Sequence, residues 1–107
     1  MKKGMIKVSV LYPNADGNTF DLDYYTSKHL ALVGALLGDA VKGATVEKGL
    51  GGAAPGAPAT FSVMSNLYFD TVEDFQNSFG PNADEIMADL PNFCNSAPTI
   101  QVSEVVI

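Results

Sequence analysis

The chain has 107 residues, of which 47% are hydrophobic and 17% are charged. This balance excludes a disordered chain and predicts one globular domain spanning residues 1–107 around a single hydrophobic core. The net charge of −6 and the pI of about 4.4 argue against nucleic-acid binding and against an anionic membrane surface, because both rest on lysine and arginine.

The single cysteine and the single histidine limit the chemistry further. One cysteine excludes an internal disulfide bond and suits a reducing compartment, so we expect a cytoplasmic protein. One histidine and one cysteine are too few for a zinc site without carboxylates or a second subunit, and no metal site is expected. No secretory signal is visible, and no apolar run approaches the roughly 18 residues of a membrane span.

The first half of the chain predicts a strand, a helix and a second strand. Residues 5–12 alternate apolar and polar side chains, which is typical of a strand. Residues 19–37 carry apolar side chains at helical spacing; Thr19 or Asp21 can cap the start, and Gly38 can supply the left-handed residue beyond the end. Residues 41–50 are rich in β-branched side chains and predict the second strand.

The second half of the chain repeats the pattern. The glycine- and proline-rich segment 49–58 predicts a hairpin connection or a mobile flap, followed by a clearly alternating strand over 60–69. Thr71 and the acidic residues after it resemble a capping box that opens a second helix. Gly80-Pro81 interrupts this helix, Asn82 can cap a further helical turn, and residues 99–107 predict the last strand.

The resulting β-α-β-β-α-β order predicts an α+β fold of ferredoxin-like type, with a four-stranded antiparallel sheet and both helices on one face. The predicted strands carry apolar residues on both faces, for example Val63 opposite Met64 and Val102 opposite Val105. Helices cover only one face of such a sheet. We therefore predict a homodimer in which sheet packs on sheet.

The candidate catalytic residues lie on the first predicted helix. Tyr25 and His29 are four residues apart and share one helical face with the apolar side chains that should meet the sheet. Burial there favours a neutral imidazole, which can act as a general base or proton shuttle on an enolisable or phenolic substrate. The alternative is a packing histidine whose nitrogens are satisfied by a backbone carbonyl or a tyrosine hydroxyl. Tyr24 and Tyr25 can likewise be packing residues.

Other polar residues have two interpretations each. Asn66 and Tyr68 share a strand face with Ser62 and can line a polar pocket or the dimer interface. Asp21 serves either as a helix cap or as a contact to a ligand. Cys94 has no histidine at a nucleophile spacing, so a buried and unreactive thiol is expected.

Two segments resemble the signature of the EthD family. The first is Phe20-Asp21-x-x-Tyr24-Tyr25-x-x-x-His29, preceded by Tyr12-Pro13, and the second is Asp89-Leu90-Pro91-Asn92-Phe93. The resemblance covers nearly the whole chain. Two departures stand out: Leu30-Ala31-Leu32 follows the histidine where relatives have an x-Pro-Leu-like stretch, and Cys94 stands where a threonine is common.

The resemblance implies a dimeric α+β barrel, a superfamily with cofactor-free monooxygenases, lactone isomerases, polyketide cyclases and haem enzymes. It also implies a cavity between sheet and helices that the residues of the first motif would face. We therefore predict His29, Tyr25 and Tyr24 as catalytic residues. The predicted substrate contacts are Asp21, Asn66, Tyr68 and Phe93.

Three functions are ranked on this basis. The first is a cofactor-independent enzyme of oxygenase, isomerase or cyclase type, in which His29 is the base, Tyr25 positions a small apolar or aromatic metabolite, and Tyr24 or Asn66 donates to a developing oxyanion. The second is a non-catalytic small-molecule-binding or accessory protein of a degradation pathway. The third is a haem-binding barrel with His29 as ligand, against which stands the lack of a basic cluster for the propionates.

Overall fold

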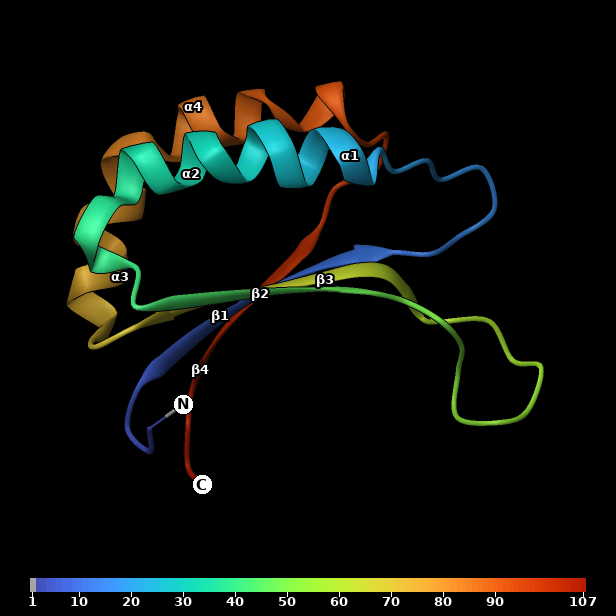
Figure 1. Ribbon diagram of the computed structural model, residues 1–107, viewed down its shortest axis with the longest axis horizontal. Coiled ribbons are helices and arrows are strands. Elements are labelled where there is room, and N and C mark those ends of the chain that lie inside the picture. The colour runs from blue at the N-terminus through green and yellow to red at the C-terminus, as the bar shows by residue number, and fades with distance from the viewer. Residues whose placement is uncertain (1) are drawn as a thin grey trace.

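The computed structural model describes residues 2–107 of the chain, so Met1 lies outside it. Its strands are β1 (Ile6–Pro13), β2 (Gly43–Lys48), β3 (Phe61–Phe69) and β4 (Thr99–Glu104), and its α-helices are α1 (Leu22–Tyr24), α2 (Leu30–Leu37), α3 (Val72–Phe79) and α4 (Ala83–Ala88). The strands form one antiparallel sheet in the order β2-β3-β1-β4. The helices lie on one side of this sheet (Figure 1). The predicted ferredoxin-like α+β fold is therefore confirmed.

The first predicted helix is continuous from residue 22 to residue 37 and contains a π turn, Tyr25–His29, between α1 and α2. Its cap is Asp21, whose carboxylate accepts a hydrogen bond from the backbone N–H of Tyr24 at 3.0 Å. Gly38, with φ of 59°, lies just past the end as expected.

The second helical segment begins as predicted but continues differently. The hydroxyl of Thr71 accepts a hydrogen bond from the N–H of Asp74 at 3.0 Å and so caps α3. A 3₁₀ turn over Gly80–Asn82 then carries the chain directly into α4. The expectation that Asn82 caps α4 is wrong, because its amide instead donates to the carbonyls of Ser78 and Leu36.

The helix-facing side of the sheet forms the core. Strand register places Val8 opposite Leu67 and Ile6 opposite Phe69, so these side chains point to the same face. One cluster of buried residues surrounds Phe69, and a second surrounds Tyr12, Tyr25 and Phe93, nearer the start of the first helix. The second cluster contains the aromatic residues that position the candidate site.

The opposite face of the sheet is more polar than predicted. Lys7 is paired with Tyr68, Ser9 with Asn66, and Leu11 with Met64. Met64 is 37% exposed there, which agrees with an apolar component on this face. Val102 and Val105 do not lie on opposite faces of one strand as predicted, because β4 ends at Glu104.

Candidate functional site

The π turn places Tyr25 and His29 toward the sheet. The N–H of Leu30 donates to the carbonyl of Tyr25, five residues earlier, instead of four. Within the turn, the hydroxyls of Thr26 and Ser27 donate to carbonyls four residues earlier, and such bonds bend helices. The rings of Tyr25 and His29 stack with 5.3 Å between centroids, and both residues are buried.

A small cavity of about 50 Å³ lies between the sheet and the helices beside these two rings. Its lining is apolar apart from four residues, which are Tyr12, Tyr25, His29 and Ser65. Met87 and Ile100 also line it and are 40% and 43% exposed, so the cavity approaches the surface on that side. The predicted pair Tyr25 and His29 is thus brought together at the wall of an apolar cavity.

The imidazole of His29 is held by an acidic residue. Its Nδ1 lies 2.9 Å from Oδ2 of Asp89. Burial raises the pKa of Asp89, but hydrogen bonds from Asn92, Tyr24 and His29 outweigh it and lower that pKa below the usual range. An ionised carboxylate only accepts hydrogen bonds, so a neutral His29 carries its proton on Nδ1 and a lone pair on Nε2. The hydrogen bond to Asp89 uses Nδ1, and the ring of His29 borders the cavity.

The hydroxyl of Tyr25 is a hydrogen-bond donor at neutral pH. Burial raises the pKa of Tyr25, and hydrogen bonds with Ser65 and Tyr12 offset part of the rise. Burial, followed by the interaction with Tyr25, raises the pKa of Tyr12 well above its usual range. The lining of the cavity therefore combines a potential base, His29, with protonated phenols.

The third predicted catalytic residue, Tyr24, lies elsewhere. Its hydroxyl donates to Oδ1 of Asp89 at 2.7 Å, and Tyr24 is not among the residues that line the cavity. The hydrogen bond to Asp89, above all, raises the pKa of Tyr24. Tyr24 thus contacts the partner of His29, and the predicted donation to an oxyanion does not fit its position.

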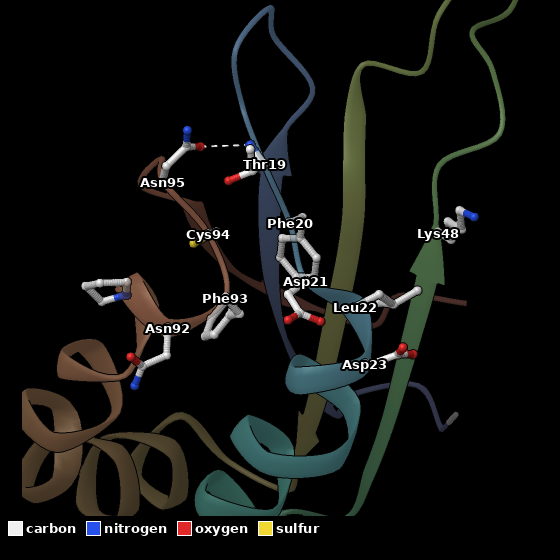
Figure 2. Close-up of a pocket in the computed structure, with 11 residues that line it drawn as sticks. Thr19, Phe20, Asp21, Leu22, Asp23, Lys48, Asn92, Phe93, Cys94 and Asn95 are labelled. Carbon is white, nitrogen blue, oxygen red and sulfur yellow. Dashed lines mark hydrogen bonds between the residues drawn. The ribbon is translucent and has the colours of Figure 1, made fainter.

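Asp21 and Phe93 belong to a separate, open depression of about 730 Å³ on the surface (Figure 2). In Figure 2 its two walls are residues 19–23 and residues 92–95, with Lys48 at the far side. The N–H of Asp21 donates to the carbonyl of Phe93 at 2.7 Å. The ring of Phe93 lies 4.6 Å from that of His29, so Phe93 stands between the depression and the histidine.

Asn66 and Tyr68 are on the other face of the sheet. Asn66 accepts from the hydroxyl of Ser9 at 3.1 Å and donates to Thr45 and Glu47 at 3.1 and 2.9 Å. Alternation along β3 turns Asn66 and Tyr68 away from His29, whereas Ser65 borders the cavity. The prediction that Asn66 supplies an oxyanion donor beside His29 is therefore corrected, and Ser65 occupies the suitable strand position.

Sequence reasoning missed the role of Asp89. It lies 60 residues from His29, and no local spacing connects the two. The available signal was the Asp89-Leu90-Pro91-Asn92-Phe93 segment, whose acidic residue can be paired with the histidine of the other motif. The expectation for Cys94 agrees with the structure: the thiol is buried, and burial raises its pKa.

Two further features bear on the site. Within residues 2–107, no three histidine, cysteine or acidic side chains are grouped so as to hold a metal ion. No helix in the described part of the chain has both the length and the apolar character needed to cross a membrane.

The fold and the site define a small ferredoxin-like α+β protein with a histidine–aspartate pair beside an internal cavity. The EthD domain matches residues 17–97, a range that contains both motifs. The chain therefore belongs to the EthD family. No protein of curated function matches it.

Solved structures share the fold, and one of them, at 43% identity, supports the same family. An EthD-like protein from Ralstonia eutropha JMP134 is 43% identical, with a TM-score of 0.92 over 99% of this chain and 96% of that one. An ethyl tert-butyl ether (EthD) family protein from Bacillus halodurans C-125 is 20% identical, with a TM-score of 0.70 over 94% and 97%. A protein assigned as an antibiotic biosynthesis monooxygenase, from Bordetella bronchiseptica, shares the fold at 16% identity and a TM-score of 0.61 over 98% and 100%.

Proposed function

We propose that this EthD family protein is a cofactor-independent enzyme of oxygenase, isomerase or cyclase type. Its substrate is a small apolar or aromatic metabolite bound in the cavity between sheet and helices. One observation carries the proposal: the buried imidazole of His29 borders an apolar cavity while its Nδ1 is held by Asp89. A histidine with a carboxylate on one nitrogen and a ligand space beside the ring has the arrangement of a general base.

Each polar residue of the cavity has a defined role in this proposal. Nε2 of His29 removes a proton from an acidic C–H or O–H group, which leaves an enolate or phenolate. The hydroxyl of Tyr25 donates a hydrogen bond to the new oxyanion, and Ser65 and Tyr12 orient that hydroxyl through their own hydrogen bonds. Such a base typically contributes about 10²- to 10⁴-fold to the rate.

The size of the cavity restricts how the substrate enters. About 50 Å³ is room for only a few water molecules, whereas ligand pockets measure roughly 300–1,000 Å³. Met87 and Ile100 are exposed members of the lining, so we propose that their movement enlarges the cavity and admits the ligand.

The test is a panel of aryl ketones, aryl-substituted lactones and hydroquinones, followed by deuterium uptake from heavy water or by oxygen consumption. We expect turnover in at least one class, and His29→Gln should lower it by roughly 10²- to 10⁴-fold while the variant stays folded. Tyr68→Phe, on the other sheet face, is the control and should leave the rate unchanged. Probes that bind at the cavity without any turnover would instead favour a binding or accessory protein.

A haem-binding barrel ranks third because the residues present do not fit the group. No lysine or arginine lines the cavity, which leaves the two propionates without basic partners. The cavity is also far smaller than a porphyrin. A Soret band after addition of haem would contradict this ranking.

The proposed assembly is a homodimer through sheet-on-sheet packing in the cytoplasm. The support for the dimer is the sheet face opposite the helices, which carries Leu11, Met64 and Tyr68 beside polar residues. The support for the cytoplasm is the single, unpaired Cys94.

A further inference from the structure

Tyr24, Asn92 and Asp89 form a hydrogen-bonded group next to His29. Oδ1 of Asp89 accepts from the hydroxyl of Tyr24 at 2.7 Å and from Nδ2 of Asn92 at 2.8 Å. Nδ2 of Asn92 also lies 3.3 Å from the Tyr24 hydroxyl. Oδ2, the other oxygen, is left for Nδ1 of His29 at 2.9 Å. The two carboxylate oxygens therefore have separate partners.

We propose that Tyr24 and Asn92 are positioning residues that keep Asp89 ionised and direct its Oδ2 to His29. The imidazole then keeps its proton on Nδ1 and presents an unprotonated Nε2 on the side of the cavity. The catalytic meaning of this inference rests on the proposed function, but the hydrogen-bond geometry is independent of any turnover.

The local backbone explains why these residues meet. Pro91 lies at the start of a 3₁₀ turn over Leu90–Asn92, and the N–H of Asn92 donates to the carbonyl of Asp89 at 3.1 Å. This turn brings the Asn92 amide back to the Asp89 carboxylate. Tyr24, the residue just before the π turn, approaches the same carboxylate from the first helix.

The electrostatics agree with this geometry. Burial alone would raise the pKa of Asp89, yet the hydrogen bonds from Asn92, Tyr24 and His29 bring it below its usual range. Besides Asp89, the charged side chain of Lys28 also lies near Tyr24, with its Nζ 5.6 Å from the centre of the phenol ring. A protonated acid or an amide at position 89 can donate to Nδ1 and move the histidine proton to Nε2, whereas an ionised carboxylate cannot.

Nitrogen-15 NMR of the untagged protein tests the inference directly, because His29 is the only histidine in the chain. At neutral pH we expect the Nδ1–H tautomer in the wild type. Asp89→Asn should reduce that tautomer in favour of Nε2–H. A wild-type protein that shows mainly the Nε2–H tautomer would overturn the inference without any variant.

A separate measurement tests the positioning role of Tyr24 and Asn92. It is the pH at the midpoint of the titration of the Asp89 carboxyl group, followed through the NMR signal of its carboxyl carbon. Tyr24→Phe and Asn92→Ala should each shift this midpoint upward, because each removes a donor from Oδ1. Tyr68→Phe removes a phenol on the other sheet face and should leave the midpoint unchanged. Equal midpoints in all three variants would overturn the role. Turnover without the Nδ1–H tautomer refutes only this inference, and the tautomer without turnover refutes only the proposed function.

Discussion

The ring of Phe93 packs against the ring of His29, with 4.6 Å between their centroids, and Phe93 is 3% exposed. This contact joins the two sequence motifs and closes the histidine off from the open surface depression. The carbonyl of Phe93 also accepts from the N–H of Asp21, which anchors the start of the first helix. Phe93 is therefore a core residue that packs against the histidine of the site.

Phe93→Ala should lower the free energy of unfolding by about 3–5 kcal/mol, because it removes a buried aromatic ring. It should also move the NMR signals of the His29 imidazole. Phe69→Ala is the matched control: Phe69 is fully buried in the other core cluster, so a similar loss of stability is expected with the His29 signals unmoved. Equal effects of the two variants on His29 would show that Phe93 has no special relation to the site.

The stability of the fold should depend on pH through Asp89. Its pKa in the folded state is lowered from the ordinary 3.8, since the hydrogen bonds from Asn92, Tyr24 and His29 outweigh burial. A lowered native pKa contributes stability that is present above the unfolded value and is lost as the pH falls through the native value. The difference in unfolding free energy between wild type and Asp89→Asn should therefore shrink below about pH 4.

Urea unfolding at a series of pH values measures this difference. The free energy of unfolding of Tyr68→Phe should differ from that of the wild type by the same amount at every acidic pH. If the difference in unfolding free energy between wild type and Asp89→Asn widens on acidification, the carboxyl group of Asp89 is not stabilised in its ionised form.

The entrance to the cavity is expected at Ile100. Ile100→Trp places a larger side chain at the exposed edge of the lining and should weaken the binding of a small apolar probe such as phenol at least about tenfold. Val102→Trp is the matched control, because Val102 is two residues along the same strand, equally exposed at 44%, and not part of the lining. If both variants bind phenol alike, the ligand enters elsewhere.

The sheet-on-sheet dimer should be disrupted by a charge on the face opposite the helices. Met64→Glu introduces a carboxylate that a second copy would have to bury, so the sedimentation mass should fall to that of one chain at micromolar concentration. Val72→Glu changes a residue of similar exposure on α3 and should leave the mass unchanged. A wild-type protein that sediments as one chain would contradict the dimer itself.

The fold followed from local signals in the sequence. Alternation in 5–12 and 60–69 corresponds to the paired central strands β1 and β3, and Asp21, Thr71 and Gly38 mark helix ends as their chemistry requires. The site followed only in part. The face shared by Tyr25 and His29 is a local property of one helix, whereas Asp89 reaches His29 through tertiary packing.

Other errors have the same physical origin. Ser65 and Asn66 are adjacent in β3, so their side chains point to opposite faces of the sheet. Because both are polar, the strand pattern did not reveal which of them faces the helices. Asn82 failed as a cap because the chain enters α4 from a preceding helical turn. The spacing of apolar residues along the first helix does not reveal the π turn over Tyr25–His29.

The role of His29 as a base requires that its Nε2 contacts a bound ligand, and this contact can be measured. Nitrogen-15 spectra of the untagged protein, recorded while phenol is added, report both ring nitrogens of the one histidine. We expect a saturable shift of the Nε2 signal as it accepts the phenol hydroxyl, while Nδ1 keeps its proton beside Asp89. Phenol that binds, as judged by other signals of the protein, with Nε2 unmoved would contradict the role of His29 as the base.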